Sequence, residues 1–377
     1  KNEPKIKSIN IDDFLVNIVR YENDDKSNIA EIFGKKEKKD KNKTPQIHLD
    51  ELNLNDGHVI VWNQNKTPKR PVLMDYYHID VDDIDMLLKD VSFDGDTITG
   101  YMNKLTASEK SGFTIDEFGS ESKFIVSSKT LDFKNLIVKT HSTSLNLNLK
   151  FLYNNYNAYT KFVDSIMIVA NIRPSQLTLS DLEYFSKTMG KMTDTLQIQG
   201  LIVGTVSDFE ANDFRFSFKD STMFNGDIKM KGLPKFHDTH ISGKVKKMEF
   251  TYQDISEFSI PTPNRKIPLP KTLDAVKSAI LDGNFYGFPN NFNTDFNLHT
   301  NIGNINLNGA INNDLDIVPN PYYFIRAHVN NLNVNELLNL KDEIQTSFYI
   351  DLSGEGITKQ DAGLQTTIDI EKIKYKD

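Results

Sequence analysis

The sequence predicts a mainly β protein, built from antiparallel strands that each have one apolar face, with a few short helices. Three observations predict this class: strict period-two alternation in many segments, turn signals between those segments, and few stretches with helical periodicity. Side chains along a strand point alternately to opposite faces, so period-two alternation gives a strand one apolar face and one polar face.

The clearest alternation lies between residues 292 and 311. From Phe292 to Ile302 the even-numbered residues are apolar or Thr, and the odd-numbered residues are Asn, Asp or His. After Gly303 the phase shifts by one position, so that Ile305 and Leu307 alternate with Asn. A turn or bulge at Gly303 would keep the apolar side chains on one side of the sheet. We therefore predict an antiparallel hairpin with one buried face.

Other segments follow the same pattern. The side chains expected on their apolar faces are Leu145, Leu147 and Leu149 in "SLNLNLKF", and Phe214, Phe216 and Phe218 in "DFRFSFK". Turns between strands are expected at residues 55–57 (Asn-Asp-Gly) and 94–95 (Asp-Gly), because these residue types favour tight turns.

A longer repeat also exists. The pattern Gly-x3-Gly-x4-Phe occurs in "GLIVGTVSDF" from Gly200 and again, 83 residues later, in "GNFYGFPNNF" from Gly283. Each copy precedes Phe-rich strands. Repeated units that each leave an apolar face open are typical of stacked, elongated architectures.

Few helices are expected. Ser180 and Glu183 have the spacing of a capping box, which predicts a helix with Ser180 as its N-cap. A second helix is predicted from about Leu273 to just before Gly283, and the lysine-rich run 35–43 is predicted to be a mobile surface loop.

Composition excludes several classes of protein. The 377 residues include 44 basic and 52 acidic ones, a net charge of −8, which argues against a nucleic-acid partner. No apolar run is long enough to span a membrane. Cysteine is absent, which excludes disulfides, thiolate metal sites and cysteine nucleophiles. The chain starts without an initiator Met or a secretory sequence and stops within a strand pattern, so we expect a segment of a longer protein.

No catalytic constellation stands out, and we predict no enzymatic activity, cofactor or metal site. The acidic run "HIDVDDID" does not fit a calcium loop, because Ile84 stands at a ligand position and the turn glycine is missing. We interpret His78, Asp80 and Asp82 as one solvated face of a strand. A hydrolase acting on envelope polymers would need a clustered acid pair, which the sequence does not mark out.

Two interpretations of the apolar faces remain open at this point. The faces of two sheets could close on each other as a filled sandwich, about 10 Å apart. Alternatively, one sheet could curl along its length into a gutter whose apolar lining stays open to acyl chains or unfolded polypeptide. Both need one dry face, and pattern alone favours the sandwich.

A resemblance changes that preference. The phrases "LTASEKSGF" (Leu105–Phe113), "LIVKTHS" (Leu136–Ser142), "LSDLEYF", "MKGLP", "IPLP", the two Gly-x3-Gly-x4-Phe units and "YYFIRAHVNNLNVNELL" follow one another in a fixed order. Together they resemble the AsmA-like superfamily, and most of all the TamB translocation and assembly module proteins of Bacteroidetes-type bacteria. The resemblance covers nearly everything from about Gln46 onward.

The resemblance implies an elongated antiparallel β-groove, also called a β-taco, built from repeating β-groove units with an apolar interior. It implies such a groove over residues 45–377, with approximate sub-blocks 45–158, 159–234, 235–313 and 314–377, and leaves residues 1–44 with their charged loop unassigned. The side chains expected to line the groove are Leu145, Leu147, Leu149, Phe214, Phe216, Phe218, Phe292, Phe296, Leu298, Ile302, Ile305 and Leu307.

The resemblance also implies a function. We expect a periplasmic segment of an inner-membrane-anchored protein, which shields phospholipid acyl chains for transfer between the inner and outer membranes and supports outer-membrane biogenesis. The N-terminal anchor and the C-terminal domain, which would meet an outer-membrane assembly factor, are expected to be missing from this segment. Two alternatives remain: a chaperone for outer-membrane or secreted proteins that uses the same groove, and a filled β-sandwich binding module of the cell envelope.

Overall fold

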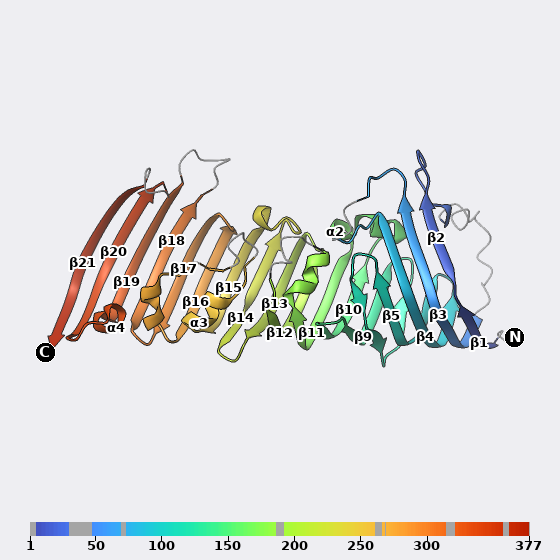
Figure 1. Ribbon diagram of the computed structural model, residues 1–377, viewed down its shortest axis with the longest axis horizontal. Coiled ribbons are helices and arrows are strands. Elements are labelled where there is room, and N and C mark those ends of the chain that lie inside the picture. Colours follow the sequence, from blue (N-terminus) through green and yellow to red (C-terminus); the bar gives the residue numbers. More distant parts are fainter. Residues whose placement is uncertain are drawn as a thin grey trace. The chain divides into compact units, whose positions relative to one another are not determined.

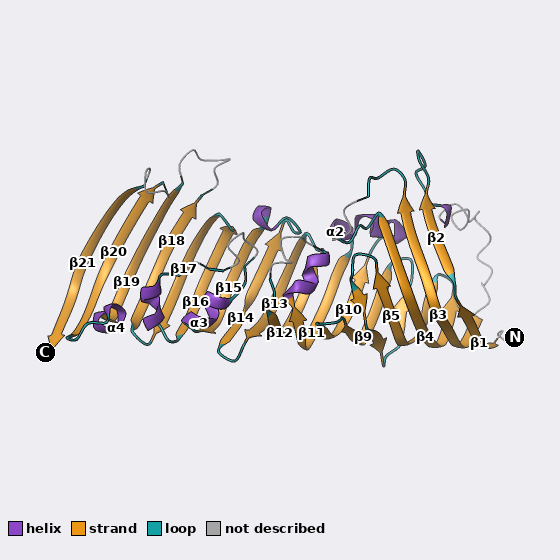
Figure 2. Cartoon of the chain, in the orientation of Figure 1, coloured by secondary structure: helices purple, strands orange, loops and turns teal. Residues whose placement is uncertain are grey.

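The computed structural model describes residues 5–29, 47–68, 73–185, 192–260, 266–267, 269–313, 321–356 and 362–376. The chain divides into two compact units, Lys1–Thr195 and Leu196–Asp377. Strands dominate both units and the helices are short (Figures 1 and 2), so the predicted mainly β, groove-like fold class is confirmed. No helix within the described ranges is long and apolar enough to cross a membrane.

The first unit is an open sheet in which β3, β4 and β5 pair in chain order, as do β9, β10 and β11. Three short strands, β6 to β8, lie between β5 and β9. Its elements are β1 (Lys5–Asp12), β2 (Leu15–Arg20), β3 (Ile47–Asn63), β4 (His78–Asp94), β5 (Thr97–Glu109), β6 (Thr114–Ile115), β7 (Glu117–Ser120), β8 (Phe124–Val126), β9 (Thr130–Lys139), β10 (Ser144–Leu152), η1 (Tyr156–Lys161), α2 (Phe162–Ser165), β11 (Met167–Thr178) and η2 (Leu179–Tyr184).

The N-terminal edge is the exception to antiparallel pairing, because β1 and β2 both run parallel to β3. The turn predicted at residues 55–57 is wrong: β3 continues through them, and Asp56 adopts φ 51° in a bulge. The ring of Phe14 packs so closely over Gly57 that a Cβ atom there would lie 2.0 Å from it. The bulge therefore faces the break between β1 and β2, and β3 stays in register with both. The turn predicted at residues 94–95 is confirmed between β4 and β5.

The first unit has a packed apolar core. Leu136 and Val91 are 0% and 1% exposed. The ring of Phe133 lies between those of Phe118 and Phe124, with centroid distances of 5.2 and 5.6 Å. The charged run 35–43 lies outside the described residues.

The capping box predicted at Ser180 is wrong. The segment is the 3-10 helix η2, its N-cap is Thr178, and that cap forms no side-chain hydrogen bond to the helix. The Asp181 carboxylate instead accepts hydrogen bonds of 2.6 Å from the hydroxyls of both Thr140 and Ser142. These bonds tie η2 to the turn between β9 and β10.

The second unit is one open sheet of ten strands, in which each strand pairs antiparallel with the next along the chain (Figure 1). Its elements are β12 (Thr195–Gly204), β13 (Asp208–Phe218), β14 (Thr222–Lys231), η4 (Phe236–Asp238), β15 (His240–Phe250), α3 (Tyr252–Glu257), η5 (Lys271–Ala275), β16 (Ala279–Phe288), β17 (Asn291–Thr300), β18 (Gly303–Asn312), β19 (Tyr322–Asn333), α4 (Val334–Leu338), β20 (Glu343–Glu355) and β21 (Gly363–Lys376).

The hairpin predicted between residues 292 and 311 is confirmed. Strands β17 and β18 form it, and the turn residues 301–302 separate the opposed pair Thr300 and Gly303. The helix predicted from Leu273 is wrong beyond Ala275, because the 3-10 helix η5 ends there and β16 begins at Ala279. Ala279 pairs with strands on both sides and is 2% exposed, so sheet formation overrides the local helical preference.

The two Gly-x3-Gly-x4-Phe units form equivalent hairpins. In the later copy Gly283 lies opposite Phe296 and Gly287 lies opposite Phe292. Both glycines have φ near +140°, and a Cβ on Gly283 would lie 2.0 Å from the carbonyl oxygen of Asp295. Only glycine fits such a position, which also brings its backbone against the facing Phe. The earlier copy repeats the arrangement with Gly200 against Phe214 and Gly204 against Phe209.

Candidate functional site

One face of the second unit is apolar across its whole sheet. Directly opposed residues on successive strands form rows that cross the sheet. One row contains Ile198, Phe216, Phe224, Met248, Leu281, Leu298, Ile305, Val329, Phe348 and Ile370. Every strand from β12 to β21 contributes one residue to this row, and none of the residues is polar.

Three further rows lie beside it on the same face, because their residues are two, four and six positions away on most strands, and a bulge adds one position on β13 and on β15. The next row contains Phe214, Gly226, Val245, Gly283, Phe296, Leu307, Ala327, Ile350 and Ile368. The third contains Ile202, Ala211, Ile228, Gly243, Phe285, Thr294, Gly309, Ile325, Leu352 and Thr366. The fourth contains Gly204, Phe209, Met230, Ile241, Gly287, Phe292, Ile311, Tyr323, Gly354 and Leu364. No charged side chain occurs in the four rows.

The opposite face of the same strands is polar and internally hydrogen-bonded. The side-chain amide of Asn297 donates to Asp282 on the preceding strand at 2.9 Å. Asn297 in turn accepts a 2.7 Å bond from the amide of Asn306 on the following strand. Further along the same row, His328 lies 2.9 Å from the Glu371 carboxylate. Water can therefore solvate this face, and many of its polar groups are uncharged amides.

Three short helices cover one end of the apolar face (Figure 2). Helices α3, η5 and α4 lie near the strand ends. Their side chains and those of the sheet line a partly open cavity of about 260 Å3. The cavity is lined by Phe250, Tyr252, Ile255, Leu269, Leu273, Val276, Ala279, Leu298, Thr300, Ile302, Gly303, Ile305, Val329, Leu332, Leu337 and Phe348. All ten described strands of this unit belong to one sheet, so no second sheet of those residues closes over the face.

The cavity wall offers a dry environment. It contains no charged side chain, and the Thr300 hydroxyl is satisfied because it donates to the Gly303 carbonyl at 2.7 Å and accepts from the Ile302 N–H at 3.2 Å. Its volume lies slightly below the range of about 300–1,000 Å3 that is usual for small-molecule pockets. The cavity can therefore accept part of a hydrocarbon chain, while the rest would extend along the open rows.

The structure brings together three of the predicted lining residues in this cavity: Leu298, Ile302 and Ile305. The other predicted residues lie outside it. Phe292, Phe296 and Leu307 are half-buried in the neighbouring rows, Phe214 and Phe216 are half-buried and Phe218 is buried on β13, and in the first unit Leu145 and Leu149 are half-buried and Leu147 is buried on β10. Their role as a lipid-binding lining stays a prediction.

Sequence reasoning missed the residues that the helices contribute, Ile255, Leu273, Val276 and Leu337. Leu273 and Val276 lie in the segment that was predicted to be helical but was not expected to line a site, whereas Ile255 and Leu337 belong to helices of five or six residues that helical periodicity does not reveal. The one usable signal was an apolar residue in a short segment directly before or after an alternating strand, as with Leu337 after β19.

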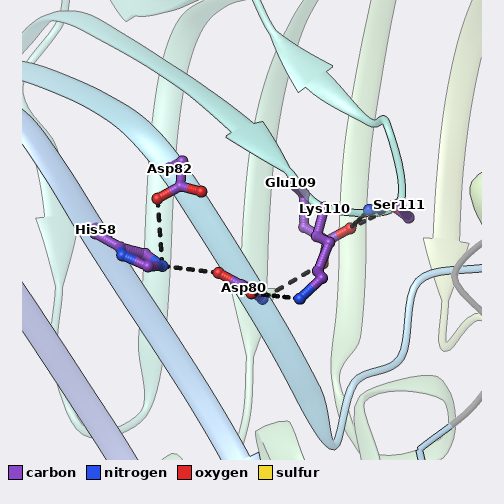
Figure 3. Close-up of polar contacts among 6 residues, drawn as sticks. All are labelled: His58, Asp80, Asp82, Glu109, Lys110 and Ser111. Atoms are coloured by element: carbon purple, nitrogen blue, oxygen red, sulfur yellow. Dashed lines mark hydrogen bonds and ion pairs between the residues drawn. The ribbon is translucent and has the colours of Figure 1, made fainter.

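A group of polar residues on β3 and β4, in the first unit, has metal-ligand chemistry (Figure 3). The Nε2 atom of His58 lies 2.7 Å from Asp80 Oδ1 and 3.2 Å from Asp82 Oδ1. The Lys110 ammonium donates to the other oxygen of Asp80 at 3.0 Å. Hydrogen bonds from His58 and Lys110 lower the pKa of the Asp80 carboxyl below its usual value. The carboxyl is therefore ionised at neutral pH.

The interpretation of His78, Asp80 and Asp82 as one solvated face is wrong for His78. Its ring is buried at the start of β4, where Nδ1 lies 2.8 Å from Asp75 and Nε2 lies 3.0 Å from the Asn63 carbonyl. Trp62 packs edge-on against it, which removes the ring from solvent. Asp80 and Asp82 meet His58 instead.

Comparison with known proteins finds no match for this chain. No family model, no curated protein and no solved structure matches it. What the protein binds must therefore be inferred from the chemistry of its own surfaces and cavity.

Proposed function

We propose that the second unit holds the acyl chains of phospholipids on its apolar face. The observation that carries the proposal is the set of four uncharged rows, of which three continue across every strand from β12 to β21 and one runs from β13 to β21. A surface of this kind favours a long, flexible, apolar ligand. Half-burial of Phe296 and Leu298 leaves their side chains available to such a ligand.

The energetics favour acyl chains. Moving hydrocarbon from water to an apolar surface gains about 0.8 kcal/mol for each buried methylene. Since the rows contain no charge, no point along them binds a head group strongly, and a lipid can change position at small cost. The head group itself would remain in water beyond the apolar rows, as it does when amphipathic molecules bind at interfaces.

The family resemblance sets the proposed biological context. We infer that the chain is a segment of a TamB-like protein that works in the periplasm and supports outer-membrane biogenesis. In that setting a surface for acyl chains would keep phospholipids out of water between the inner and outer membranes. The apolar rows support this context. So do the two hairpins that contain the Gly-x3-Gly-x4-Phe pattern, β12–β13 and β16–β17, which we call the Gly–Phe hairpins. Both features recur along the unit, as repeating groove units require.

Site-specific photocrosslinking in the bacterial envelope tests the proposal. A photoreactive residue at Phe296 or Leu298 is expected to give adducts with phospholipid. Asn297 is the matched control, because it lies between them on β17 but points to the other face, where it bonds with Asp282 and Asn306. Lipid adducts at Asn297 as abundant as those at Leu298, or adducts at none of the three, would contradict lipid binding.

The nature of the adduct also separates lipid from polypeptide cargo. Adducts with protein in place of lipid at Phe296 and Leu298 would favour a chaperone that uses the same face. Native mass spectrometry of the purified chain gives an independent readout, since bound phospholipid adds its own mass.

A further inference from the structure

We propose that His58, Asp80 and Asp82 form a binding site for a divalent transition-metal ion, of which zinc is the best fit. One imidazole nitrogen and two carboxylate oxygens converge there, and all three ligand atoms lie within 4.8 Å of one another (Figure 3). The site is on the polar side of β3 and β4, in the other unit from the apolar cavity, and it is independent of the proposed lipid function.

The spacing of the ligand atoms suits an ion. A tetrahedral zinc ion lies about 2.0 Å from its ligands, which places neighbouring ligand atoms roughly 3.3 Å apart. The two distances from His58 Nε2, 2.7 Å to Asp80 and 3.2 Å to Asp82, require only small movements to reach that value. Three protein ligands on one side of the ion leave the fourth position to water, as in open zinc sites.

The strands hold these ligands in place. Ile60 lies opposite Asp80 and Val59 lies opposite Val81, so the backbone ladder fixes β3 relative to β4 beside the site. The backbone N–H of His58 donates to the Phe14 carbonyl at 2.8 Å, which ties the histidine to the residue just before β2. Ligands on paired strands lose little freedom on binding a metal, and this favours affinity.

The ligand atoms are available. Lys110 occupies Oδ2 of Asp80, so Oδ1 remains directed at His58. The Asp82 carboxylate makes no hydrogen bond or ion pair to any described residue except His58, and the side chain is 59% exposed. Binding needs the His58 tautomer with its proton on Nδ1, which frees Nε2 for the ion. A mixed nitrogen and oxygen set selects zinc, copper or nickel over magnesium and calcium, which prefer oxygen alone.

A second histidine provides a natural control. His48 Nε2 also lies near two carboxylates, at 3.0 Å from Asp50 and 3.3 Å from Asp90. There the oxygen of Asp50 that faces the histidine is also 3.2 Å from the ammonium of Lys5. Asp90 is paired with Lys123 as well. With a lysine on each carboxylate, one of them on the ligand oxygen itself, this group should not bind zinc.

Zinc titration of the full chain tests the site, using calorimetry and competition with a chromophoric zinc chelator. We expect one high-affinity zinc ion per chain. Asp82→Asn, which preserves shape, and His58→Ala should each weaken its binding by about tenfold or more. Lys110→Met should strengthen it, because the variant removes a positive charge from the ligand Asp80. His48→Ala should leave the affinity unchanged.

Thermal unfolding gives a second readout that does not depend on the chelator. Zinc should raise the unfolding temperature of the wild-type protein and of His48→Ala, because an ion that binds only the folded state stabilises it. At the same zinc concentration it should raise that of Asp82→Asn by less, and circular dichroism would show this variant to be folded. No zinc binding by the wild type, or equal binding by the wild type and both ligand variants, would overturn the site.

Discussion

The side-chain amide of Asn306 donates a 2.7 Å hydrogen bond to the side-chain oxygen of Asn297, its direct partner on the neighbouring strand. Asn297 continues this series of hydrogen bonds, because its own amide donates to Asp282 at 2.9 Å. The abundance of Asn on the polar side of β17 and β18 thus has a structural explanation. An amide both donates and accepts, so it can link two neighbours across a sheet, whereas a charged group does only one of these.

This ladder makes a testable contribution to stability. Asn297→Ala should lower the free energy of unfolding by about 1–2 kcal/mol, because it leaves two partners without a hydrogen bond. A double-mutant cycle with Asn306→Ala, measured by urea unfolding, should give a coupling energy of about 0.5–1 kcal/mol. Asn293→Ala is the control, since Asn293 is exposed on the same strand and its side chain bonds to no described residue. Additive effects of the two ladder variants would refute the coupling.

In the Gly–Phe hairpins, the addition of a single methyl group to a glycine should strongly lower the stability of the protein. Gly283→Ala should cost about 3 kcal/mol or more, because the residue combines a positive φ with a backbone oxygen 2.0 Å from the new Cβ. Gly363→Ala in β21 is the matched control, since nothing lies within 4 Å of its Cβ position. The urea concentration at the unfolding midpoint of Gly363→Ala should stay close to that of the wild type. Equal losses in the two variants would mean that glycine is not required by the hairpin.

Filling the cavity should separate lipid binding from stability. Ile305→Trp places a larger ring in the space of about 260 Å3, so it should reduce the phospholipid that remains bound on purification without unfolding the chain. Ile325→Trp introduces the same ring on the same face, in a row outside the cavity wall, and should have a smaller effect. Quantitative lipid extraction compares them. Undiminished lipid in the Ile305 variant would remove the cavity from the proposed path.

The Asp227 carboxylate leads to a prediction about stability at low pH. The backbone N–H of Asp213 and the ammonium of Lys246 each donate to Asp227 at 2.9 Å and hold the pKa of its carboxyl below the usual value. A carboxyl with a lowered folded-state pKa stabilises the fold at pH values above the unfolded-state pKa of about 3.9. That contribution is lost as the pH falls through the lower, folded-state pKa.

Asp227→Asn should therefore destabilise the protein at pH 7, and its difference from the wild type should shrink as the pH falls below about 4. Denaturant unfolding across this pH range measures the difference. Asp220→Asn serves as the control, because the Asp220 carboxylate lies in an exposed turn and bonds to no described residue. A constant difference between Asp227→Asn and the wild type at every pH would contradict the assigned cause.

Period-two alternation predicted the β17–β18 hairpin and the face of each strand. It could do so because burial on one side of a sheet imposes a pattern on consecutive residues of a single strand. The errors share a different cause. The Asn-Asp-Gly turn became a bulge because Phe14, distant along the chain, packs on Gly57. The helix after Leu273 gave way to β16 because Ala279 pairs with two strands.

The candidate sites were less accessible to the sequence for the same reason. His58 lies 22 residues before Asp80, and only the register between β3 and β4 brings them together. The apolar rows were foreseeable strand by strand, through residues such as Phe296 and Leu298. Their alignment across the sheet depends on every bulge between β12 and β21, and single-strand patterns contain no such information.

Each Gly–Phe hairpin fixes its own alignment through contacts between adjacent strands. A gene that duplicates or deletes such a module, with its bulges intact, would encode a longer or shorter protein with the same apolar surface. Chain length and surface chemistry can then evolve separately.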